Sequence, residues 1–345
     1  MKELKIQINP KVIRKLLIIR PRFIGDVLLS TPLVRALKSG IPRLKISYLA
    51  EEASLDVLKN NPYVDKLITL ERGSLADDLL MIKNIRKRKF DAVIDTFGNP
   101  RTALLTYFSG AKYRIGWGHR GRKYAYTHFV GDGTGLSLDA IDEYNRAARI
   151  FGIESPAKET FLKLTNAERK FANEYFRGHG LCSGKSVIGL HPGASWPAKM
   201  WPPEKFAALA DRFMANGFNV IVFSGPKDRV VGAKVIMLMK KKPVFADNLP
   251  LRAFSAVVSL LDGFISNDNG AMHVAAALKI PLAGIFGPGN PKVWFPYIKN
   301  AVWLQKIMPC WPCRKDHCED MKCMRALNVE EVYAAFASIS VRKKK

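Results

Sequence analysis

The sequence predicts an α/β protein with two Rossmann-like, doubly wound parallel sheets, one in each half of the chain. Short apolar runs alternate with helical patterns almost from end to end. The length of 345 residues suggests about two domains at roughly 150 residues each. Hydrophobic residues make up 48% of the chain, which supplies a core for each half and excludes a mainly disordered protein.

In the N-terminal half, β-branched and leucine-rich runs predict the strands, and amphipathic stretches predict the helices between them. The expected strands are Lys15–Arg20, Lys45–Leu49, Asp65–Leu70 and Phe90–Asp95, and the expected helices include Val27–Lys38 and Leu75–Arg88. The domain boundary is expected within Gly152–Asn166, where Gly, Pro and Ser loosen the pattern.

The C-terminal half repeats this rhythm. Its expected strands are Ser186–Leu190, Asn219–Ser224, Gly263–Asn267 and Leu282–Phe286, and its expected helices are Pro203–Asn216, Asp228–Lys240, Leu251–Leu260, Gly270–Leu278 and Val329–Ser340. We therefore expect domains at residues 1–155 and 156–328, followed by a C-terminal helix and basic tail at 329–345. Ligands of such domains bind in a crevice at the carboxyl ends of the strands.

The charge of the chain predicts an anionic partner. There are 55 Lys and Arg against 30 Asp and Glu, a formal charge of +25. The basic residues concentrate in Lys83–Lys89, in the acid-free stretch Thr96–Gly131 and in the tail Arg342–Lys345. Nucleic acid, acidic lipid headgroups or a phosphorylated glycolipid would suit this charge, although a single cluster is more often a solvated face. With no signal peptide and no apolar run of ~20 residues, we expect a cytoplasmic protein without a membrane span.

The first strand leads into Gly25-Asp26, directly before a helix. The commonest use of Asp at that position is to cap the helix, and a functional carboxylate at the carboxyl edge of the sheet is the alternative. This turn has no G-x-G-x-x-G pattern, and no acidic residue ends the second strand to hold a ribose. An NAD enzyme is therefore not indicated.

Three loops of the C-terminal half could present backbone N–H groups to an anion. They are His191-Pro192-Gly193 with Lys199, Asp268-Asn269-Gly270 with His273, and Gly287-Pro288-Gly289. Small residues and a lysine beside a helix N-terminus suit a phosphate, but ordinary βα loops can have the same composition. A lone His on an apolar helix is usually a core residue, and its place near Asp268 raises the odds of a functional role. The spacing is not that of a Walker A loop, so ATP hydrolysis is not indicated.

The order and spacing of four segments resemble those of the ADP-heptose:lipopolysaccharide heptosyltransferases, which are family 9 glycosyltransferases of the GT-B fold. The segments are Gly25-Asp26-Val27, His191-Pro192-Gly193 with Lys199-x-Trp201-Pro202, Asp268-Asn269-Gly270-x-x-His273-x-Ala275-Ala276-Ala277, and Phe286-Gly287-Pro288. The resemblance extends from about Lys15 to Ser340.

The resemblance implies a role for individual residues. Asp26 would be the base that takes the proton of the acceptor hydroxyl. In the nucleotide-sugar site, Lys199 would bind phosphate together with the loop residues Ala194 and Ser195. Asp228 would bind the ribose, and Leu249 would contact the adenine. Asp268 would bind the sugar hydroxyls, and the diphosphate would be lined by Asn269, Gly270 and His273. Family members often have Ser or Thr where this chain has Ala194 and Asn269; Ala194 has no side-chain hydrogen bond to offer. Acceptor phosphates and carboxylates would face Arg101, Arg114, Arg120, Arg122 and Lys123.

The resemblance also implies the reaction: transfer of heptose from ADP-L-glycero-D-manno-heptose to a lipid A–Kdo or heptosylated inner-core acceptor of lipopolysaccharide. With no Asp-x-Asp motif, we expect inverting transfer that requires no metal cofactor. We expect a monomer, peripheral at the cytoplasmic face of the inner membrane and without a nucleic-acid partner. Two alternatives remain open: a GT-B transferase for another nucleotide sugar, and a non-catalytic basic nucleic-acid-binding protein, for which no RNP, HTH or OB signature is present.

Four cysteines lie within fourteen residues, in the pattern Cys310-x2-Cys313-x4-Cys318-x4-Cys323. Four thiolates at such spacing could hold a structural zinc ion, although x4 in the second pair departs from the usual x2. A cytosolic location argues against stable disulfides. Cys182 stands apart and is expected to be inert.

Overall fold

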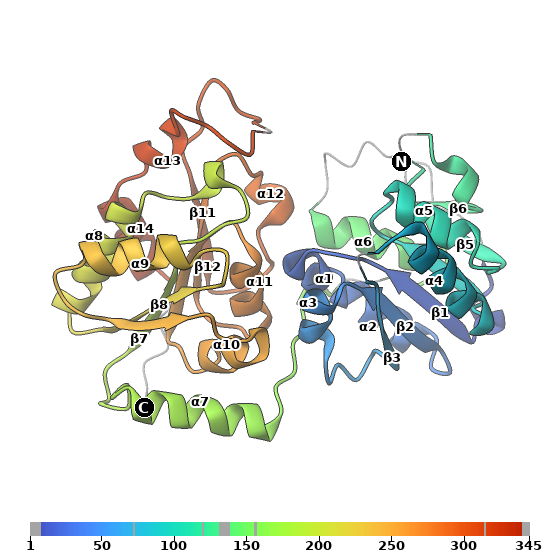
Figure 1. Cartoon of the computed structure of the whole chain (residues 1–345), viewed down its shortest axis with the longest axis horizontal. Coiled ribbons are helices and arrows are strands. Elements are labelled where there is room, and N and C mark those ends of the chain that lie inside the picture. Colours follow the sequence, from blue (N-terminus) through green and yellow to red (C-terminus); the bar gives the residue numbers. More distant parts are fainter. Residues whose placement is uncertain are drawn as a thin grey trace. The chain divides into compact units, whose positions relative to one another are not determined.

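Each half of the chain folds around a six-stranded sheet in which every strand pair is parallel (Figure 1). The computed structural model describes residues 8–71, 73–118, 121–130, 139–154, 157–313 and 315–339. The strand orders are β3-β2-β1-β4-β5-β6 and β12-β11-β10-β7-β8-β9. The chain divides into two units, Met1–Lys163 (unit 1) and Leu164–Lys345 (unit 2), at a point inside the Gly152–Asn166 stretch.

Unit 1 contains alternating strands and helices. In chain order they are η1 (Pro10–Val12), β1 (Lys15–Ile19), α1 (Ile24–Leu29), α2 (Thr31–Gly40), β2 (Lys45–Ala50), α3 (Glu52–Leu55), η2 (Asp56–Leu58), β3 (Lys66–Thr69), α4 (Leu75–Lys87), β4 (Ala92–Asp95), α5 (Pro100–Tyr107), β5 (Tyr113–Gly116), η3 (Lys123–Ala125), β6 (His128–Phe129) and α6 (Ala140–Arg149). All residues of β1 after Lys15 are buried, as expected for a parallel sheet covered on both faces. Side chains of α4 and α5 pack with Leu17, Ile19 and Val93 on one face of the sheet.

The predicted helix Val27–Lys38 is wrong in its bounds, because the segment contains two helices. The first, α1, begins at Ile24, and α2 begins at Thr31 with Pro32 in its first turn. Proline has no N–H to continue a preceding helix, and it fits the first turn of a new one. The elements α5, β5, β6 and α6 lie outside the predicted set, in a stretch without long apolar runs.

Unit 2 has the same architecture. Its elements are α7 (Asn166–Gly178), β7 (Val187–His191), η4 (Pro197–Lys199), α8 (Pro203–Ala215), β8 (Asn219–Ser224), α9 (Arg229–Leu238), β9 (Val244–Asp247), α10 (Leu251–Val258), β10 (Gly263–Asn267), α11 (Gly270–Ala277), β11 (Leu282–Phe286), α12 (Pro291–Trp294), β12 (Ala301–Gln305), α13 (Lys322–Ala326) and α14 (Val329–Ala337). The predicted strands and helices of this half are confirmed to within a few residues. The two edge strands, β9 and β12, are additional.

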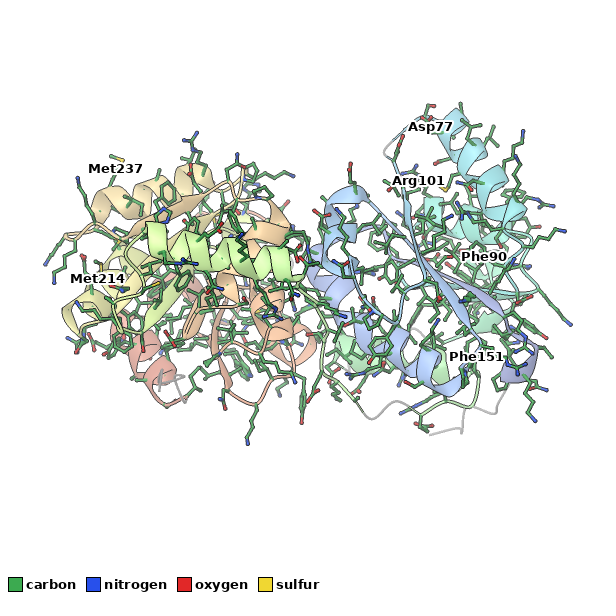
Figure 2. The ribbon with its side chains drawn as sticks, turned by 90° about the horizontal axis from the view of Figure 1, so that it is seen from below. Asp77, Phe90, Arg101, Phe151, Met214 and Met237 are labelled. Atoms are coloured by element: carbon green, nitrogen blue, oxygen red, sulfur yellow. The ribbon has the colours of Figure 1, made fainter. Side chains whose placement is uncertain are left out.

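The C-terminal helix α14 is part of the unit 2 core. It packs against α8, and Val332 and Phe336 are buried in the same apolar cluster. A Cβ on Gly263 would lie 2.1 Å from the Phe336 ring, so glycine at the start of β10 lets the helix approach closely. Figure 2 shows such interior packing, with Phe90 and Phe151 inside unit 1, whereas Met237 projects from unit 2. Among the described helices, none has the length and apolarity needed to cross a bilayer.

Candidate active site

The predicted site residues follow strand ends. Because all strands within a unit are parallel, the segments after their carboxyl ends gather at one edge of each sheet. In unit 1, Asp26 follows β1. In unit 2, Lys199, Asp228, Leu249 and Asp268 follow β7, β8, β9 and β10, respectively.

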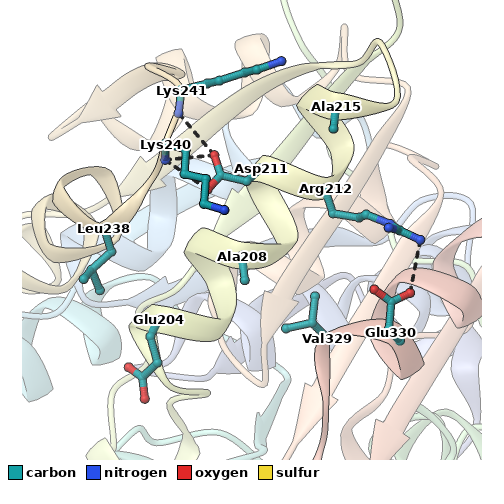
Figure 3. Close-up of a pocket in the computed structure, with 10 residues that line it drawn as sticks. All are labelled: Glu204, Ala208, Asp211, Arg212, Ala215, Leu238, Lys240, Lys241, Val329 and Glu330. Carbon is teal, nitrogen blue, oxygen red and sulfur yellow. Dashed lines mark hydrogen bonds and ion pairs between the residues drawn. The ribbon is translucent and has the colours of Figure 1, made fainter.

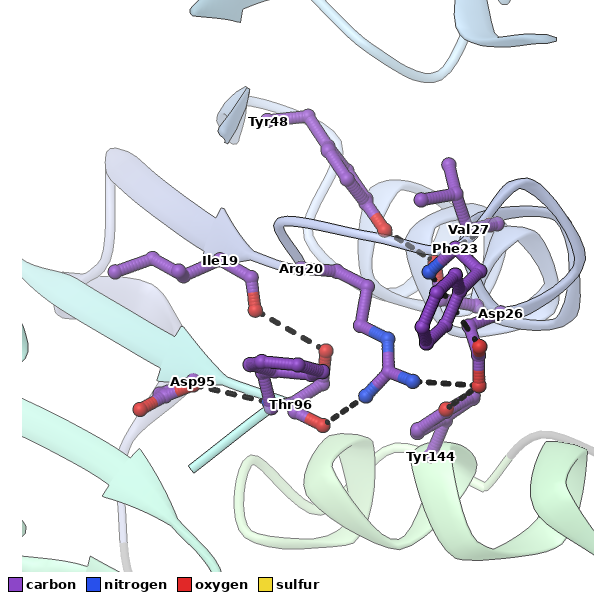
Figure 4. A network of polar contacts seen from close by, with 11 residues as sticks. Ile19, Arg20, Phe23, Asp26, Val27, Tyr48, Asp95, Thr96 and Tyr144 are labelled. Carbon is purple, nitrogen blue, oxygen red and sulfur yellow. Dashed lines mark hydrogen bonds and ion pairs between the residues drawn. The ribbon is translucent and has the colours of Figure 1, made fainter. Parts of the chain in front are cut away.

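In unit 1, Asp26 belongs to a buried polar network (Figure 4). The Arg20 guanidinium, at the end of β1, lies 2.5 Å from Asp26 Oδ1 and also donates to the Thr96 carbonyl at 2.8 Å. The hydroxyl of Tyr144, on α6, donates to the same Oδ1 at 3.1 Å. The guanidinium carbon of Arg20 lies 4.9 Å from the centre of the Phe97 ring, so Arg20 is fixed by an ion pair, a hydrogen bond and an aromatic ring.

The two oxygens of Asp26 have different surroundings. Oδ1 accepts from Arg20 and Tyr144, while Oδ2 receives a 3.5 Å contact from the Phe23 N–H, a long hydrogen bond at the helix N-terminus. The predicted N-cap position is wrong, because Phe23 is the N-cap and Asp26 is the third residue of α1; its carboxylate contacts the N-cap N–H from inside the first turn. Burial raises the pKa of Tyr144 well above its usual value, so this hydroxyl remains a donor to the carboxylate. One carboxylate oxygen is thus fixed, and the other keeps acceptor capacity for a ligand proton.

Behind this network lies a second buried carboxylate, Asp95 at the end of β4. It accepts from the backbone N–H groups of Phe97 and Gly98 at 3.0 and 2.9 Å and from the Tyr126 hydroxyl at 2.8 Å. Burial raises the pKa of Asp95, and these hydrogen bonds partly offset that effect. The role of Asp95 is to fix the turn that supplies Thr96 and Phe97 to Arg20.

In unit 2, Lys199 and Asp268 are brought together although 69 positions separate them in the sequence. Lys199 Nζ lies 2.6 Å from Asp268 Oδ2, and it also lies 5.0 Å from the centre of the Trp196 ring. A Cβ on Gly289 would lie 2.4 Å from Asp268 Oδ2, so the glycine-rich loop after β11 passes directly over the carboxylate. The arrangement presents a cation, a carboxylate and small-residue loops at one sheet edge.

Two asparagines, the buried Asn267 and the partly buried Asn269, hold the loop that carries Lys199. Asn267 accepts from the Trp201 N–H at 3.0 Å and donates to the Pro192 carbonyl at 2.6 Å, which fixes both ends of the loop. Asn269 caps α11 by accepting from the Met272 N–H, and its amide group donates to the Gly193 carbonyl at 2.7 Å. The amide of Asn269 is therefore used inside unit 2, where it links the loops after β7 and β10.

His191 and Asp228 complete this edge of unit 2. Burial lowers the pKa of His191 to about 4, so the ring is neutral at pH 7 and its Nδ1 accepts from Asn269 at 3.1 Å. Asp228 lies against the backbone of the preceding loop, since a Cβ on Gly193 would be 2.2 Å from the Asp228 carboxyl carbon. Burial raises the pKa of Asp228, and Lys227 lowers it in part.

The remaining predicted donor-site residues differ in exposure. Ser195 is exposed and Ala194 is buried, both on the loop after β7. Gly270 is the first residue of α11, and His273 is buried one turn later in that helix. Leu249 follows β9 and packs against the interior cluster beneath α10. The structure thus gives His273 and Leu249 contacts inside unit 2, and their predicted ligand roles stay predictions.

The described acceptor candidates of unit 1 have different surroundings. Arg101, on α5, pairs with Asp78 at 2.6 Å and donates to the Glu71 carbonyl. Arg114 donates to the Ala125 and Ala111 carbonyls at 2.9 and 3.2 Å, within the β5 region. Arg122 precedes η3 and Lys123 begins it, exposed. Arg120 lies outside the described residues.

The four clustered cysteines have free thiols, as does Cys182. Burial raises the pKa of Cys323, with the nearby Cys310 and Cys318 adding to the effect. In the described part of the chain, no three or more His, Cys, Asp or Glu side chains are arranged to hold a metal ion. The segment does support the donor loop, since the Ala198 N–H donates to the Asp316 carbonyl at 3.0 Å.

A surface cavity of about 580 Å³ lies elsewhere on unit 2 (Figure 3). Its walls come from α8, from the segment after α9 and from the start of α14. Asp211 accepts from the backbone N–H groups of Lys240 and Lys241, and Arg212 pairs with Glu330 at 3.4 Å. None of the predicted site residues lines it.

Several residues that shape the two sites are absent from the sequence-based prediction. Arg20 and Asn267 had a usable signal, because each is a polar residue that ends an apolar strand. Gln305, which donates to the Gly287 and Gly289 carbonyls, also ends a strand, but that strand was itself outside the prediction. Tyr144 had no local signal, since it meets Asp26 from 118 positions away.

Two doubly wound parallel units, one with a hydrogen-bonded carboxylate after its first strand and one with phosphate-compatible loops, are the architecture of the GT-B fold. The model of glycosyltransferase family 9 (heptosyltransferase) matches residues 79–324. The chain therefore belongs to glycosyltransferase family 9, and it is an enzyme. This membership argues against the alternative of a non-catalytic nucleic-acid-binding protein.

Individual relatives agree with the family. Lipopolysaccharide heptosyltransferase 2 of Salmonella typhimurium is 27% identical over 323 residues, which cover 87% of this chain and 90% of that protein. The family 9 glycosyltransferase of Veillonella parvula superposes with a TM-score of 0.83 at 25% identity, covering 94% and 96% of the two chains. The E. coli heptosyltransferase WaaC, solved with ADP, superposes with a TM-score of 0.72 at 18% identity, covering 94% and 99%.

Proposed function

We propose that this protein transfers heptose from ADP-L-glycero-D-manno-heptose to the inner core of lipopolysaccharide. The observation that carries the proposal is the match to the heptosyltransferase family model over residues 79–324. The relatives named as lipopolysaccharide heptosyltransferases support the acceptor, and the ADP bound to the E. coli enzyme supports the donor. The acceptor is a lipid A–Kdo or heptosylated inner-core molecule, which places the enzyme at the cytoplasmic face of the inner membrane.

In this proposal Asp26 is the general base. Its Oδ2 takes the proton from the acceptor hydroxyl as the oxygen attacks the anomeric carbon of the heptose. Arg20 and Tyr144 hold Oδ1, so the carboxylate cannot rotate freely and its open oxygen keeps one direction. A base fixed in this way contributes typically 10²–10⁴-fold to such a step. Attack from the face opposite the departing ADP inverts the anomeric configuration.

The donor site in unit 2 stabilises the departing diphosphate. Negative charge builds on this group as the glycosidic bond breaks, and Lys199 supplies a cation for it. Asp268 holds Lys199 at 2.6 Å and retains Oδ1 for sugar hydroxyls. Asp228 lies beside Gly193 and binds the ribose. We infer that Lys199 and the backbone N–H groups of these loops supply the charge stabilisation, so that catalysis needs no metal.

A transfer assay tests the proposal. Purified enzyme is incubated with ADP-heptose and a heptose-deficient core acceptor, and the product is read by mass spectrometry as an increase of one heptose. UDP- and GDP-sugars serve as alternative donors. A product formed only with another nucleotide sugar would contradict the heptose assignment while leaving the GT-B class intact. Product anomeric configuration, read by NMR, tests inversion, and activity after exhaustive chelation tests metal independence.

The zinc hypothesis for Cys310, Cys313, Cys318 and Cys323 stays a prediction. The described residues offer no grouped ligand set, so the structure gives it no support beyond the proximity of three of the thiols. Metal analysis of protein purified without chelator decides it. Near-stoichiometric zinc, lost in a Cys318→Ser/Cys323→Ser variant, would establish four-thiolate ligation. If the purified protein contains no zinc and its four thiols can be titrated, the cysteines serve only to pack beside the donor loop.

A further inference from the structure

The outward face of α4 in unit 1 carries large apolar side chains that no described residue covers. Leu75, Leu79 and Leu80 are 83%, 66% and 64% exposed, respectively. In the same helix, Ile85 is buried and Ile82 packs against the core. At 3.6 residues per turn, Leu79 and Leu80 occupy the arc that faces away from Ile85, whereas Leu75 lies in line with Ile82 but is exposed in the first turn of the helix. The three leucines are therefore not needed for the core.

Helix α5 extends this apolar surface. It covers the same sheet face as α4 and contacts it, and Arg86 of α4 donates to the Phe108 carbonyl at 3.3 Å (Figure 1). Leu104 is 43% exposed, and the exposed Tyr107 ring lies 5.0 Å from Phe108 and 5.8 Å from Tyr124. We call the combined set the α4–α5 surface; it consists of Leu75, Leu79, Leu80, Leu104, Tyr107, Phe108 and Tyr124.

The charge around the α4–α5 surface is positive. Lys83 and Lys87 are exposed on the same outward arc of α4 as Leu79 and Leu80. Lys112 is exposed after α5. The two acidic residues of α4 do not cancel this charge. Asp78 is paired with Arg101 at the α5 side, and the one negative charge of Asp77, beside Ser74 at the N-terminal end of the helix, is outnumbered by the three lysines. Exposed apolar groups interleaved with lysines are the composition of an interfacial membrane-binding surface.

We propose that the α4–α5 surface binds the anionic lipid bilayer, with the leucines in the headgroup–acyl boundary and Lys83 and Lys87 on lipid phosphates. This membrane contact rests on the proposed function, because the acceptor of that reaction is linked to a lipid. Charge selects a bilayer over a second copy of the chain. A two-fold contact between copies would bring two patches of the same positive sign together, whereas lipid phosphates neutralise the lysines.

Vesicle sedimentation tests the proposal on the full chain. Wild-type protein is expected to bind vesicles of phosphatidylethanolamine and phosphatidylglycerol in a salt-sensitive manner, and to bind phosphatidylcholine vesicles weakly. Leu79→Ser/Leu80→Ser should weaken binding at least tenfold, because two apolar groups no longer enter the interface. Lys83→Gln/Lys87→Gln should weaken it about 25-fold, at roughly fivefold per charge. Val230→Ser/Met237→Ser and Lys240→Gln/Lys241→Gln, at exposed positions of unit 2, are matched controls and should bind like wild type.

The outcomes separate this surface from the catalytic assignment. With a deacylated, water-soluble acceptor, the surface variants should transfer at the wild-type rate, since none of the changed residues touches Asp26 or Lys199. The proposal would be overturned if both surface variants bound vesicles with wild-type affinity, or if the unit 2 control variants lost as much vesicle affinity as the surface variants. A lipid-free dimer that Leu79→Ser/Leu80→Ser dissociates would also overturn it, in favour of self-association. Vesicle binding by an enzyme that transfers no heptose would instead refute the proposed function alone.

Discussion

Replacing Asp26 by Asn removes the charge of the proposed base while keeping its size and one acceptor oxygen. The general-base role predicts that kcat falls by about 10²–10⁴. The affinity for ADP should stay within about twofold of wild type, because the proposed ADP contacts belong to unit 2. Transfer kinetics with saturating donor give kcat, and calorimetric titration gives the ADP affinity.

The same substitution should also reduce stability, for a reason visible in the ion pair. Arg20 and Asp26 are 2.5 Å apart and both largely buried, so Asp26→Asn leaves a buried guanidinium without its counter-charge. Removing one partner of a buried pair costs about 3–5 kcal/mol. For a unit of this size that corresponds to a Tm lower by roughly 10 °C. Activity must therefore be measured well below the unfolding transition.

A double variant distinguishes the chemical role of Asp26 from its structural role. Arg20→Met/Asp26→Asn removes both charges, so the stability should return to within about 1–2 kcal/mol of wild type. If Asp26 is the base, the activity stays low although the fold is restored. If Asp26 only caps α1 and pairs with Arg20, the activity recovers together with the stability. That recovery, or an Asp26→Asn enzyme within tenfold of wild-type kcat, would refute the reasoning.

The remaining predictions concern the donor loop, the acceptor residues and the α7–α10 contact. Lys199→Ala should weaken ADP binding about 10- to 100-fold in calorimetry, because the diphosphate loses a charge-assisted partner, whereas Lys240→Ala should leave the affinity unchanged. Arg122→Gln/Lys123→Gln should raise the acceptor KM and reduce its salt dependence, with donor affinity constant; a change in ADP affinity instead would show that the two units were assigned the wrong substrates. Glu168→Gln should lower the urea unfolding free energy by about 2–3 kcal/mol at pH 7, because hydrogen bonds from Arg252 lower the pKa of Glu168 from 4.5 to about 2. A carboxylate whose pKa is lowered in the folded state stabilises the fold above pH 4.5, and this stabilisation is lost as the pH falls to 2. The difference in unfolding free energy between Glu168→Gln and wild type should therefore shrink over that range. Glu174→Gln, which changes an exposed ion pair, should show no such pH-dependent difference.

The central strands of both sheets could be predicted because they are buried on both faces. Runs such as Leu16–Ile19 and Leu282–Phe286 are continuously apolar, and only a central parallel strand or a buried helix has that pattern. The edge strands β6 and β12 could not be predicted in this way. Each has a neighbour on one side only and is partly exposed. The strand β6 has only two residues, and the short apolar run of β12, Ala301–Leu304, cannot be told from a buried helical segment by periodicity.

The sequence predicted which loops carry the site residues, but it did not predict which side chains those residues contact. The positions of Asp26, Lys199, Asp228 and Asp268 after strand ends follow from topology alone. The partners of these residues come from other strands or helices, so local pattern carries no information about them. The predicted acceptor arginines illustrate the limit: their positive charge was visible in the sequence, but the intramolecular partners of Arg101 and Arg114 were not.

The most consequential of these invisible contacts is the one that orients the proposed base. Arg20 is covalently six positions from Asp26, yet its geometry depends on Thr96 and Phe97 after β4 and on the ring of Tyr144 in α6. A carboxylate at a helix start with no such support would rotate between capping and solvent. Here Arg20 and Tyr144 bind one oxygen, the segment after β4 holds Arg20 in place, and the other oxygen is left open. The capping and catalytic interpretations of Asp26 therefore do not compete: Oδ1 is bound by the fold, and Oδ2, with its long bond to Phe23, is the oxygen that can take a proton.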